Sequence, residues 1–420
     1  MRKLAAVAAS AVLLTAGLQA PAWAADPATD FELSWLNAKL HLTWKDNGEQ
    51  NIVLAEYDGQ QELILFANLA AGEPNDIQGF SNLQPADKVR FILRTVAADG
   101  SSVDTLSPWF DTRGPGAPAL QDANLLTNLS TTLKWTQGTV EDKTPGDPLD
   151  VPGNGTVKAV VDLPGTATKS YPFAAGTTTG TIPAQARPAA IKLVAVNEWT
   201  ETADTKTVRL GTLGAGITVP ASAAYGNRLG IKSTLDLFTS EGREERASGI
   251  KVELQARAKT TDAWKTYGRY AGNTTTAFET GIAALGNRQY RLLVPARKVV
   301  SGNVIALTPA SSTSAKSSKT FIKFVSLRFT PAAAKTGTKV DITGKIQPGA
   351  TVRGTLQYWT GSKWDKGFAV QFNNGSMLKH GRAGVDKPGT YRHRIVLPAI
   401  TVNGLLLSAT VSPTFNFTLR

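Results

Sequence analysis

Residues 355–364, TLQYWTGSKW, have the pattern of a β-hairpin. Apolar and polar side chains alternate along the first strand, a Thr-Gly-Ser turn follows, and the return strand carries Trp364. A degenerate copy, VELQARAKTTDAWK, occupies residues 252–265. Short alternating strands separated by turns allow a chain to bury its apolar side chains only by packing sheets together. This repeated hairpin therefore predicts an array of small β-units.

The last two hundred residues contain a duplication. The segment GNRQYRLLVP at 286–295 matches GTYRHRIVLP at 389–398, and Pro220 with Gly226 matches Pro331 with Gly337. The offset between the copies is 111 residues before a longer loop near residues 239–246 and 100 to 103 residues after it. Register that is kept on both sides of an insertion indicates duplication of a structural unit.

Outside the first residues, no window shows the apolar spacing of an amphipathic helix, whereas strand patterns recur about every ten residues. The chain has no cysteine, so each unit must be stable through its own apolar core. We therefore predict an all-β chain of four tandem sandwich domains that follow a signal peptide. The predicted ranges are 1–24 for the signal peptide and 25–116, 117–212, 213–324 and 325–420 for the domains.

The first residues have the organisation of a secretory signal. Arg2 and Lys3 precede an apolar stretch at 4–18, and Ala22-Trp23-Ala24 provides small residues for cleavage. No other stretch approaches the roughly 18 apolar residues of a membrane-spanning helix. We expect a secreted protein that is extracellular or loosely associated with the cell wall.

Two parts of the chain are similar to known families. A strand Trp at 44, a Leu83-x-Pro85 entry and a long alternating strand resemble a fibronectin type III domain, although Val89 stands where that family usually has a tyrosine. Residues 117–212 repeat this scheme around Trp135. The last two units resemble bacterial immunoglobulin-like domains that occur in tandem in secreted actinobacterial proteins. Their matching positions are Val340, Leu356, Gln357, Trp364, Tyr391 and Arg392. The resemblance implies a sandwich fold and release outside the cell, and it brings no catalytic residue.

The chain lacks the usual signatures of catalysis. Its three histidines, His41, His380 and His393, are dispersed, and there is no nucleophile elbow or phosphate-binding glycine loop. We expect no enzyme activity, no cofactor and no metal site. The loop at 141–155 carries Asp142, Asp147 and Asp150, whose oxygens suit calcium, but their spacing fits no EF-hand. Calcium binding by this loop is left open.

Charge is distributed unevenly among the four predicted domains. Lys and Arg number 6, 8, 16 and 13, against 14, 9, 7 and 3 Asp and Glu, so the net charges are −8, −1, +9 and +10. Such a gradient bears on association and not on fold. The acidic first domain and the basic fourth also suit head-to-tail assembly or folding back within one chain.

The basic half is the expected binding region. We expect it to hold an anionic cell-wall polymer or another polysaccharide, with no specific nucleic-acid recognition. The candidate ligand-binding residues are Arg353, Trp359, Lys363, Lys366, Arg392 and Arg394. In the competing interpretation these cations protect edge strands and Trp359 covers the hairpin beside it. The alternative functions are an adhesion or scaffold protein that binds another protein through its loops, and a glycan-active enzyme at a domain interface.

Overall fold

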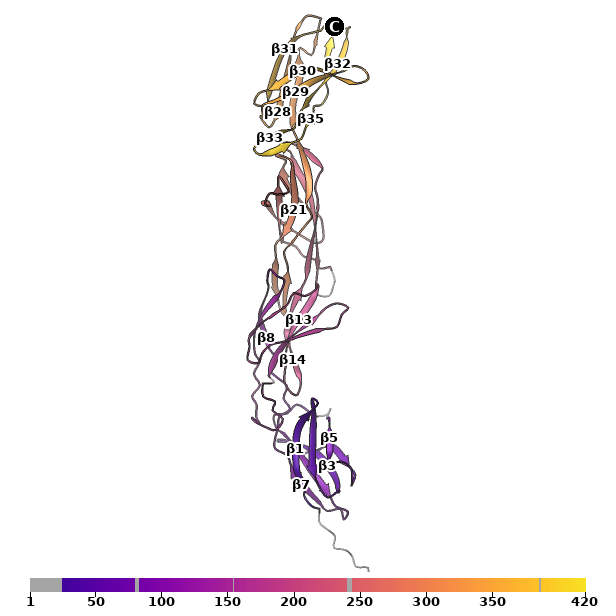
Figure 1. Cartoon of the computed structure of the whole chain (residues 1–420), viewed down its shortest axis with the longest axis vertical. Helices are drawn as coiled ribbons and strands as arrows, with labels where there is room; N and C mark the ends of the chain where they lie inside the picture. The colour runs from indigo at the N-terminus through magenta and orange to yellow at the C-terminus, as the bar shows by residue number, and fades with distance from the viewer. Residues whose placement is uncertain (1–24, 80–82, 154, 240–243, 385–386) are drawn as a thin grey trace, which may run out of the picture.

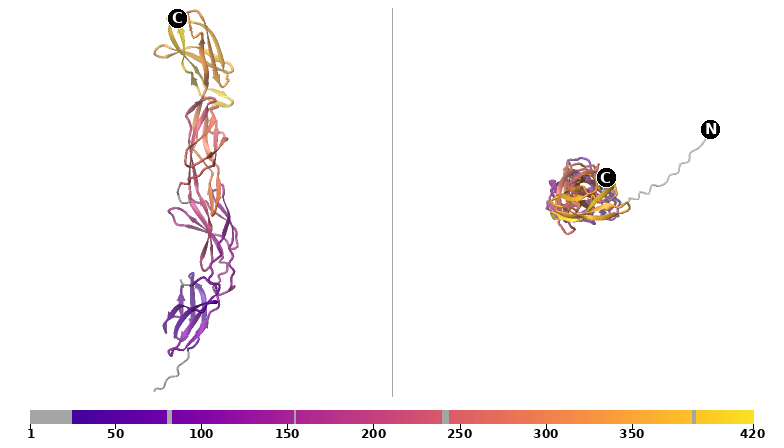
Figure 2. Two further views of the ribbon diagram at one scale, coloured as in Figure 1. Left: turned by 180° about the vertical axis from the view of Figure 1, so that it is seen from behind. Right: turned by 90° about the horizontal axis from the view of Figure 1, so that it is seen from above.

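The structure is a computed structural model that describes residues 25–79, 83–153, 155–239, 244–384 and 387–420. The predicted signal peptide and residues 240–243 of the predicted insertion lie outside these ranges. The described residues form strands and connecting turns without a helix, so the predicted all-β class is confirmed. Within these ranges, no helix long and apolar enough to cross a membrane is found. Four β-sandwiches follow one another along a rod, with the first sandwich at one end and the fourth at the other (Figures 1 and 2).

The first sandwich packs a three-stranded sheet against a four-stranded one, as a fibronectin type III-like domain does. Period-two alternation places Leu40, Leu42 and Trp44 of β2 in its core, at 0–4% exposed. Strand order in the smaller sheet is β1-β2-β5, with bounds Thr29–Leu36, Lys39–Lys45 and Asp76–Gln78. The larger sheet has the order β4-β3-β6-β7, with bounds Ile64–Leu69, Gln50–Tyr57, Val89–Val96 and Ser102–Leu106.

The second sandwich receives a hairpin from further along the chain. Its smaller sheet is β12-β9-β8, with bounds Thr179–Ile182, Thr131–Thr136 and Ala119–Leu125. Its larger sheet is β11-β10-β13-β14, with bounds Lys169–Pro172, Thr156–Asp162, Ala189–Val196 and Glu201–Leu210. This sheet continues through β23 (Val304–Thr308) and β22 (Arg297–Ser301), because β23 pairs in parallel with β14.

The third and fourth sandwiches have the same strand order, as expected of a duplication. The third combines β15-β17-β20 (Thr212–Thr218, Arg228–Phe238, Phe278–Ala283) with β16-β25-β21-β18-β19 (Ser222–Ala224, Lys316–Phe321, Arg288–Val294, Ile250–Arg257, Lys265–Gly272). The fourth combines β26-β28-β31 (Lys323–Thr330, Lys339–Gln347, Ser376–Arg382) with β27-β36-β32-β29-β30 (Ala333–Ala334, Phe415–Leu419, Gly389–Leu397, Val352–Trp359, Trp364–Phe372). Short strands β24 (Ser311–Ser312) and β35 (Thr410–Val411) pair with β21 and β32.

Each sandwich after the first places a segment against the one before it. Leu149, in the second sandwich's loop, is 1% exposed within the core of the first. Ile305 and Leu307 of β23, at 1% and 2%, belong to the core of the second. The hairpin β33–β34 (Ile400–Val402, Leu405–Leu407) lies beside the third, where the amide of Ser408 donates to the carbonyl of Thr320 at 2.9 Å. The joints are packed, and the domain boundaries at 116, 212 and 324 stay a prediction.

Candidate functional site

The predicted binding residues lie around one face of one sheet in the fourth sandwich. Gln357 of β29 stands opposite Lys366 of β30 and Arg394 of β32, and directly opposed residues project to the same side. Strand alternation places Arg353 and Arg392 on that side too, since Val352, Leu356 and Ile395 point into the core. We call this surface, Arg353, Gln357, Lys366, Arg392 and Arg394, the basic face.

Trp364 forms a support for the basic face. The guanidinium of Arg394 lies 4.4 Å from the centre of the Trp364 ring, and its Nε donates to Oε1 of Gln357 at 2.7 Å. The Trp359 ring packs on Trp364 at 5.4 Å. Arg394 is therefore held by contacts within the sheet, whereas the exposed side chains of Arg353, Lys366 and Arg392 extend into solvent.

The third sandwich repeats this arrangement with one change. Arg291 lies 4.5 Å from the ring of Trp264 and donates to Gln255 at 2.8 Å, as Arg394 does with Trp364 and Gln357. Arg257 covers Trp264 from 4.4 Å, in the position that Trp359 has in the fourth sandwich. Trp264 and Trp364 thus pack within their hairpins. Trp359 is a half-buried aromatic residue, and it distinguishes the basic face of the fourth sandwich from the matching face of the third, which has Arg257 there.

Few carboxylates compete for these cations. Asp365 lies 3.3 Å from Nζ of Lys363, in the turn of the hairpin, so Lys363 is a partly neutralised member of the predicted set. Asp341 pairs with His380 at 2.7 Å. These two are the carboxylates of the fourth sandwich within the described residues, and the basic face remains positively charged.

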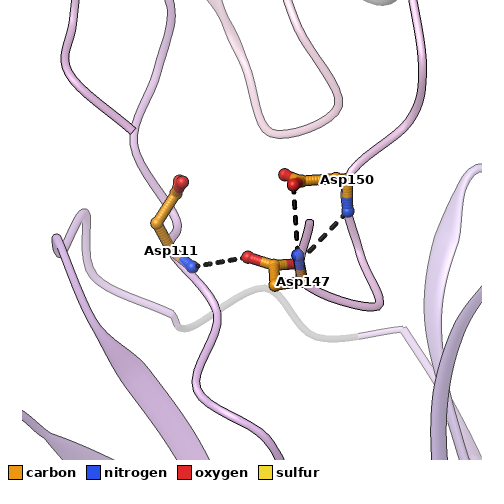
Figure 3. A group of neighbouring side chains, drawn as sticks. All are labelled: Asp111, Asp147 and Asp150. Carbon is orange, nitrogen blue, oxygen red and sulfur yellow. Dashed lines mark hydrogen bonds between the residues drawn. The ribbon is translucent and has the colours of Figure 1, made fainter. Parts of the chain in front are cut away.

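A second cluster lies where the first and second sandwiches meet. Asp111, Asp147 and Asp150 each offer a carboxylate oxygen, and the three oxygens lie within 4.8 Å of one another (Figure 3). Asp147 and Asp150 come from the loop considered for calcium, but Asp142 is not in the group. The third member is Asp111, at the end of the first sandwich. The spacing of residues within the loop could not reveal this partner.

The aspartates of this cluster serve as turn caps. Asp147 accepts hydrogen bonds from the amides of Leu149 and Asp111 at 2.8 and 3.2 Å, and Asp150 accepts one from Gly146 at 2.6 Å. Burial, together with the neighbouring charges of Asp142, Asp147 and Glu198, raises the pKa of Asp111 to about 6. Burial also raises the pKa of Asp147. Hard cations accept such oxygens, yet the hydrogen bonds alone account for the positions of these side chains.

The three histidines make few polar contacts. His41 lies between Asp76, 3.0 Å from its Nε2, and Ser34, whose Oγ is 3.4 Å from its Nδ1. His380 pairs with Asp341. His393 is half-buried, donates through Nδ1 to the carbonyl of Tyr391 at 3.1 Å, and has its pKa lowered by burial. In the part of the chain that the structure describes, no histidine joins a group of three potential metal ligands.

No family model matches the chain. No curated protein matches it either. Among solved structures, a tetra-tandem repeat from the extending region of a large adhesion protein is 12% identical, with a TM-score of 0.27, over 92% of this chain and 98% of that one. The FN1–FN3 domains of chicken CNTN1 are 12% identical, with a TM-score of 0.20, over 73% and 98%. A two-domain fibronectin type III segment of chicken tenascin is 12% identical, with a TM-score of 0.21, over 44% and 97%. Likeness this low assigns no function, so function is inferred from the chain's own residues.

Proposed function

We propose that the protein is a non-catalytic, extracellular binding or structural protein whose basic C-terminal half holds an anionic cell-wall polymer or an acidic polysaccharide. The observation that carries this proposal is the sorting of charge along the rod. Net charge changes from −8 in residues 25–116 to +10 in residues 325–420, and these segments lie at opposite ends (Figure 1). A region of one sign attracts polymers of the opposite sign and accelerates their association. Export rests on the signal sequence predicted at 1–24.

The basic face supports a repeating anionic partner. Arg353, Lys366 and Arg392 project from three neighbouring strands, which lie roughly 4.8 Å apart in a sheet. Flexible cations on a regular grid suit a polymer with a charge on each repeat. Trp359, half-buried at the edge of this face, offers a ring on which a sugar ring packs. The proposal concerns affinity for a charge pattern and assigns no reactive group.

Retention of the full mature chain on immobilised heparin and on isolated cell-wall polymer tests the proposal. We expect retention to fall steeply as salt rises, because binding releases counterions. Removing cations of the basic face is expected to reduce the slope of log affinity against log salt, because fewer counterions are released when fewer cations pair with the polymer. The variant combines Arg353→Gln, Lys366→Gln and Arg392→Gln on the basic face with Lys363→Gln in the adjoining hairpin turn.

A matched variant removes the same charge from exposed positions elsewhere in the fourth sandwich. It combines Arg328→Gln, Lys335→Gln, Lys339→Gln and Lys345→Gln. Equal loss of retention in both variants would assign binding to net charge and not to the basic face. Binding that ignores salt would instead favour a protein partner, since an interface with an apolar centre depends less on ionic strength.

A further inference from the structure

The fourth sandwich contains a cavity of about 480 Å³ that lies between its two sheets and opens to solvent. Apolar side chains of both sheets form its floor, namely Phe329, Val340, Ile342, Leu356 and Phe417. They are 3–9% exposed although they belong to the core. Protein cores rarely leave voids larger than a water molecule. A cavity of this size lies within the range of small-molecule pockets, about 300–1,000 Å³.

One difference between the two duplicated sandwiches lies in the wall of this cavity. Arg291 and Arg394 make the same contacts, so the preceding residues, Tyr290 and His393, occupy the same position. Tyr290 is 1% exposed and fills its core, where Ile231 and Leu254 are completely buried. The smaller ring of His393 lies in the cavity wall of the fourth sandwich, where the matching Ile342 and Leu356 are 5% and 3% exposed. The third sandwich is closed by a tyrosine at the place where the fourth is hollow.

The mouth of the cavity is cationic. Lys379 of β31 stands opposite the core residue Ile342 and projects toward the cavity, whereas Arg382 stands opposite Lys339, lines the rim and donates to the carbonyl of Gly337 at 3.2 Å. No carboxylate of the described residues forms an ion pair with either. Asp341, the nearby acid, is already paired with His380. His393 adds no charge to the floor at neutral pH, because burial lowers its pKa. Its Nδ1 donates to a backbone carbonyl, which leaves Nε2 as a hydrogen-bond acceptor.

We propose that this cavity binds a small amphipathic anion, with an aryl or acyl body between the sheets and an acidic head at Lys379 and Arg382. The aromatic side chains of Phe329, Phe417 and Tyr391 suit the apolar body. Lys379 provides a charge-assisted hydrogen bond to a carboxylate, sulfonate or phosphate, and Arg382 adds positive charge at the rim. This site is separate from the polymer-binding basic face, although Trp359 stands at the boundary of both.

Titration of the full mature chain tests the proposal with three ten-carbon probes, decanoate, decanol and decylammonium, and with anilinonaphthalene sulfonate as an aryl anion. We expect saturable binding of one molecule, with decanoate held about tenfold more tightly than decanol, as one charge-assisted contact provides. Decylammonium should bind more weakly than decanol. Comparing decanoate with the aryl sulfonate shows which body the cavity prefers.

Two sets of variants test separately the contacts to the acidic head of the ligand and the contacts to its apolar body. Lys379→Gln with Arg382→Gln should remove the preference for decanoate and leave decanol affinity unchanged. Lys345→Gln, an exposed position on β28, should change neither. His393→Tyr introduces the side chain that closes the third sandwich and should abolish binding of every probe. Binding retained in a folded His393→Tyr protein would overturn the proposal.

A readout on the unmodified chain covers the case in which His393→Tyr does not fold. Methyl resonances of Ile342 and Leu356 should shift on addition of decanoate, whereas those of Ile231 and Leu254 in the third sandwich should not. Absence of saturable binding, or equal shifts in both sandwiches, would also overturn the proposal. Loss of heparin retention does not bear on this result, since that measurement reports the basic face.

Discussion

Asp111 is a carboxyl group in a place that favours its neutral form. It lies between the first and second sandwiches, beside Asp147 and Asp150, and its pKa is raised to about 6. A carboxyl whose pKa is higher in the folded state than in the unfolded state costs stability when it is ionised. This cost is absent below the unfolded pKa, near 3.8, and is fully present above about pH 6. The joint between these sandwiches is therefore weakest at neutral and alkaline pH.

Asp111→Asn should remove this cost. Asparagine keeps the acceptor for the Arg113 amide, which donates to Asp111 Oδ1 at 2.8 Å, and carries no charge. We expect the variant to raise the melting temperature of the first two sandwiches at pH 7.5 and to change it little at pH 4. Calorimetry at both values measures the difference.

The control is Asp99→Asn, in an exposed turn of the first sandwich. Hydrogen bonds from Ser101 lower the pKa of Asp99, so its ionised form is favoured by folding. This variant should not stabilise the protein at neutral pH. An Asp111→Asn protein that behaves like Asp99→Asn would contradict the burial of Asp111.

The hairpin β22–β23 is the element that joins the third sandwich to the second. Ile305 and Leu307 complete the core of the second sandwich, and Lys298 of the hairpin contacts Asp122 and donates to Asn124 at 3.0 Å. The amide of Gly211 donates to the carbonyl of Leu307 at 2.9 Å. A fragment that ends near residue 212 therefore loses part of its sheet and exposes the edge of β14.

Ile305→Ala should destabilise the second sandwich, although residue 305 lies in the predicted third domain. Truncation of a fully buried isoleucine costs about 2–5 kcal/mol. We expect faster hydrogen exchange in β13 and β14 and a lower unfolding transition for the second sandwich. Val300→Ala, at a 60% exposed position of the same hairpin, should cost less than about 0.5 kcal/mol. Destabilisation confined to the third sandwich would contradict the assignment.

Local sequence pattern predicted the strands and the duplication, but not the segments that one sandwich contributes to the core of its neighbour. Alternation in β2 and β29 identifies which residues are buried, because each strand faces one core. The partner of β23 depends on how consecutive sandwiches meet, and no local period encodes that contact. Leu149 lies in a loop rich in Pro, Gly and Asp, so its insertion into another core left no periodic signal. The cavity in the fourth sandwich has His393 in its wall, where the third sandwich has the buried Tyr290, and this contrast appears only when the two cores are compared.

The whole molecule is a rod in which every joint is packed. At the first joint, the indole Nε1 of Trp35 donates to the carbonyl of Leu149 at 2.8 Å, and its ring meets Trp199 at 5.0 Å. At the joint between the third and fourth sandwiches, the backbone amide of Asn287 donates to the carbonyl of Leu406 at 2.8 Å. Its side-chain Nδ2 donates to Oγ of Ser408 at 3.0 Å. These contacts make the relative orientation of neighbouring sandwiches a property of the fold.

Gly286→Ala should loosen the joint between the third and fourth sandwiches. A Cβ at this position would lie 2.4 Å from Cβ of Leu405, which cannot move without its hairpin. We expect a broader distribution of dimensions in small-angle X-ray scattering, with both sandwiches still folded. Gly389 has the matching place in the duplicate, and its Cβ would meet nothing closer than 3.9 Å. Gly389→Ala should leave the scattering unchanged, and a similar effect of both substitutions would contradict the role of this joint.

The segments inserted between sandwiches also bear on the proposed attachment through the basic end. Stiff joints prevent the acidic tip from bending back to neutralise the basic tip. A protein anchored through its basic end then presents the acidic tip at a constant height. Under the proposed anchoring, neighbouring copies would repel one another through acidic tips of like sign, and the outer layer would carry negative charge like the polymer beneath it.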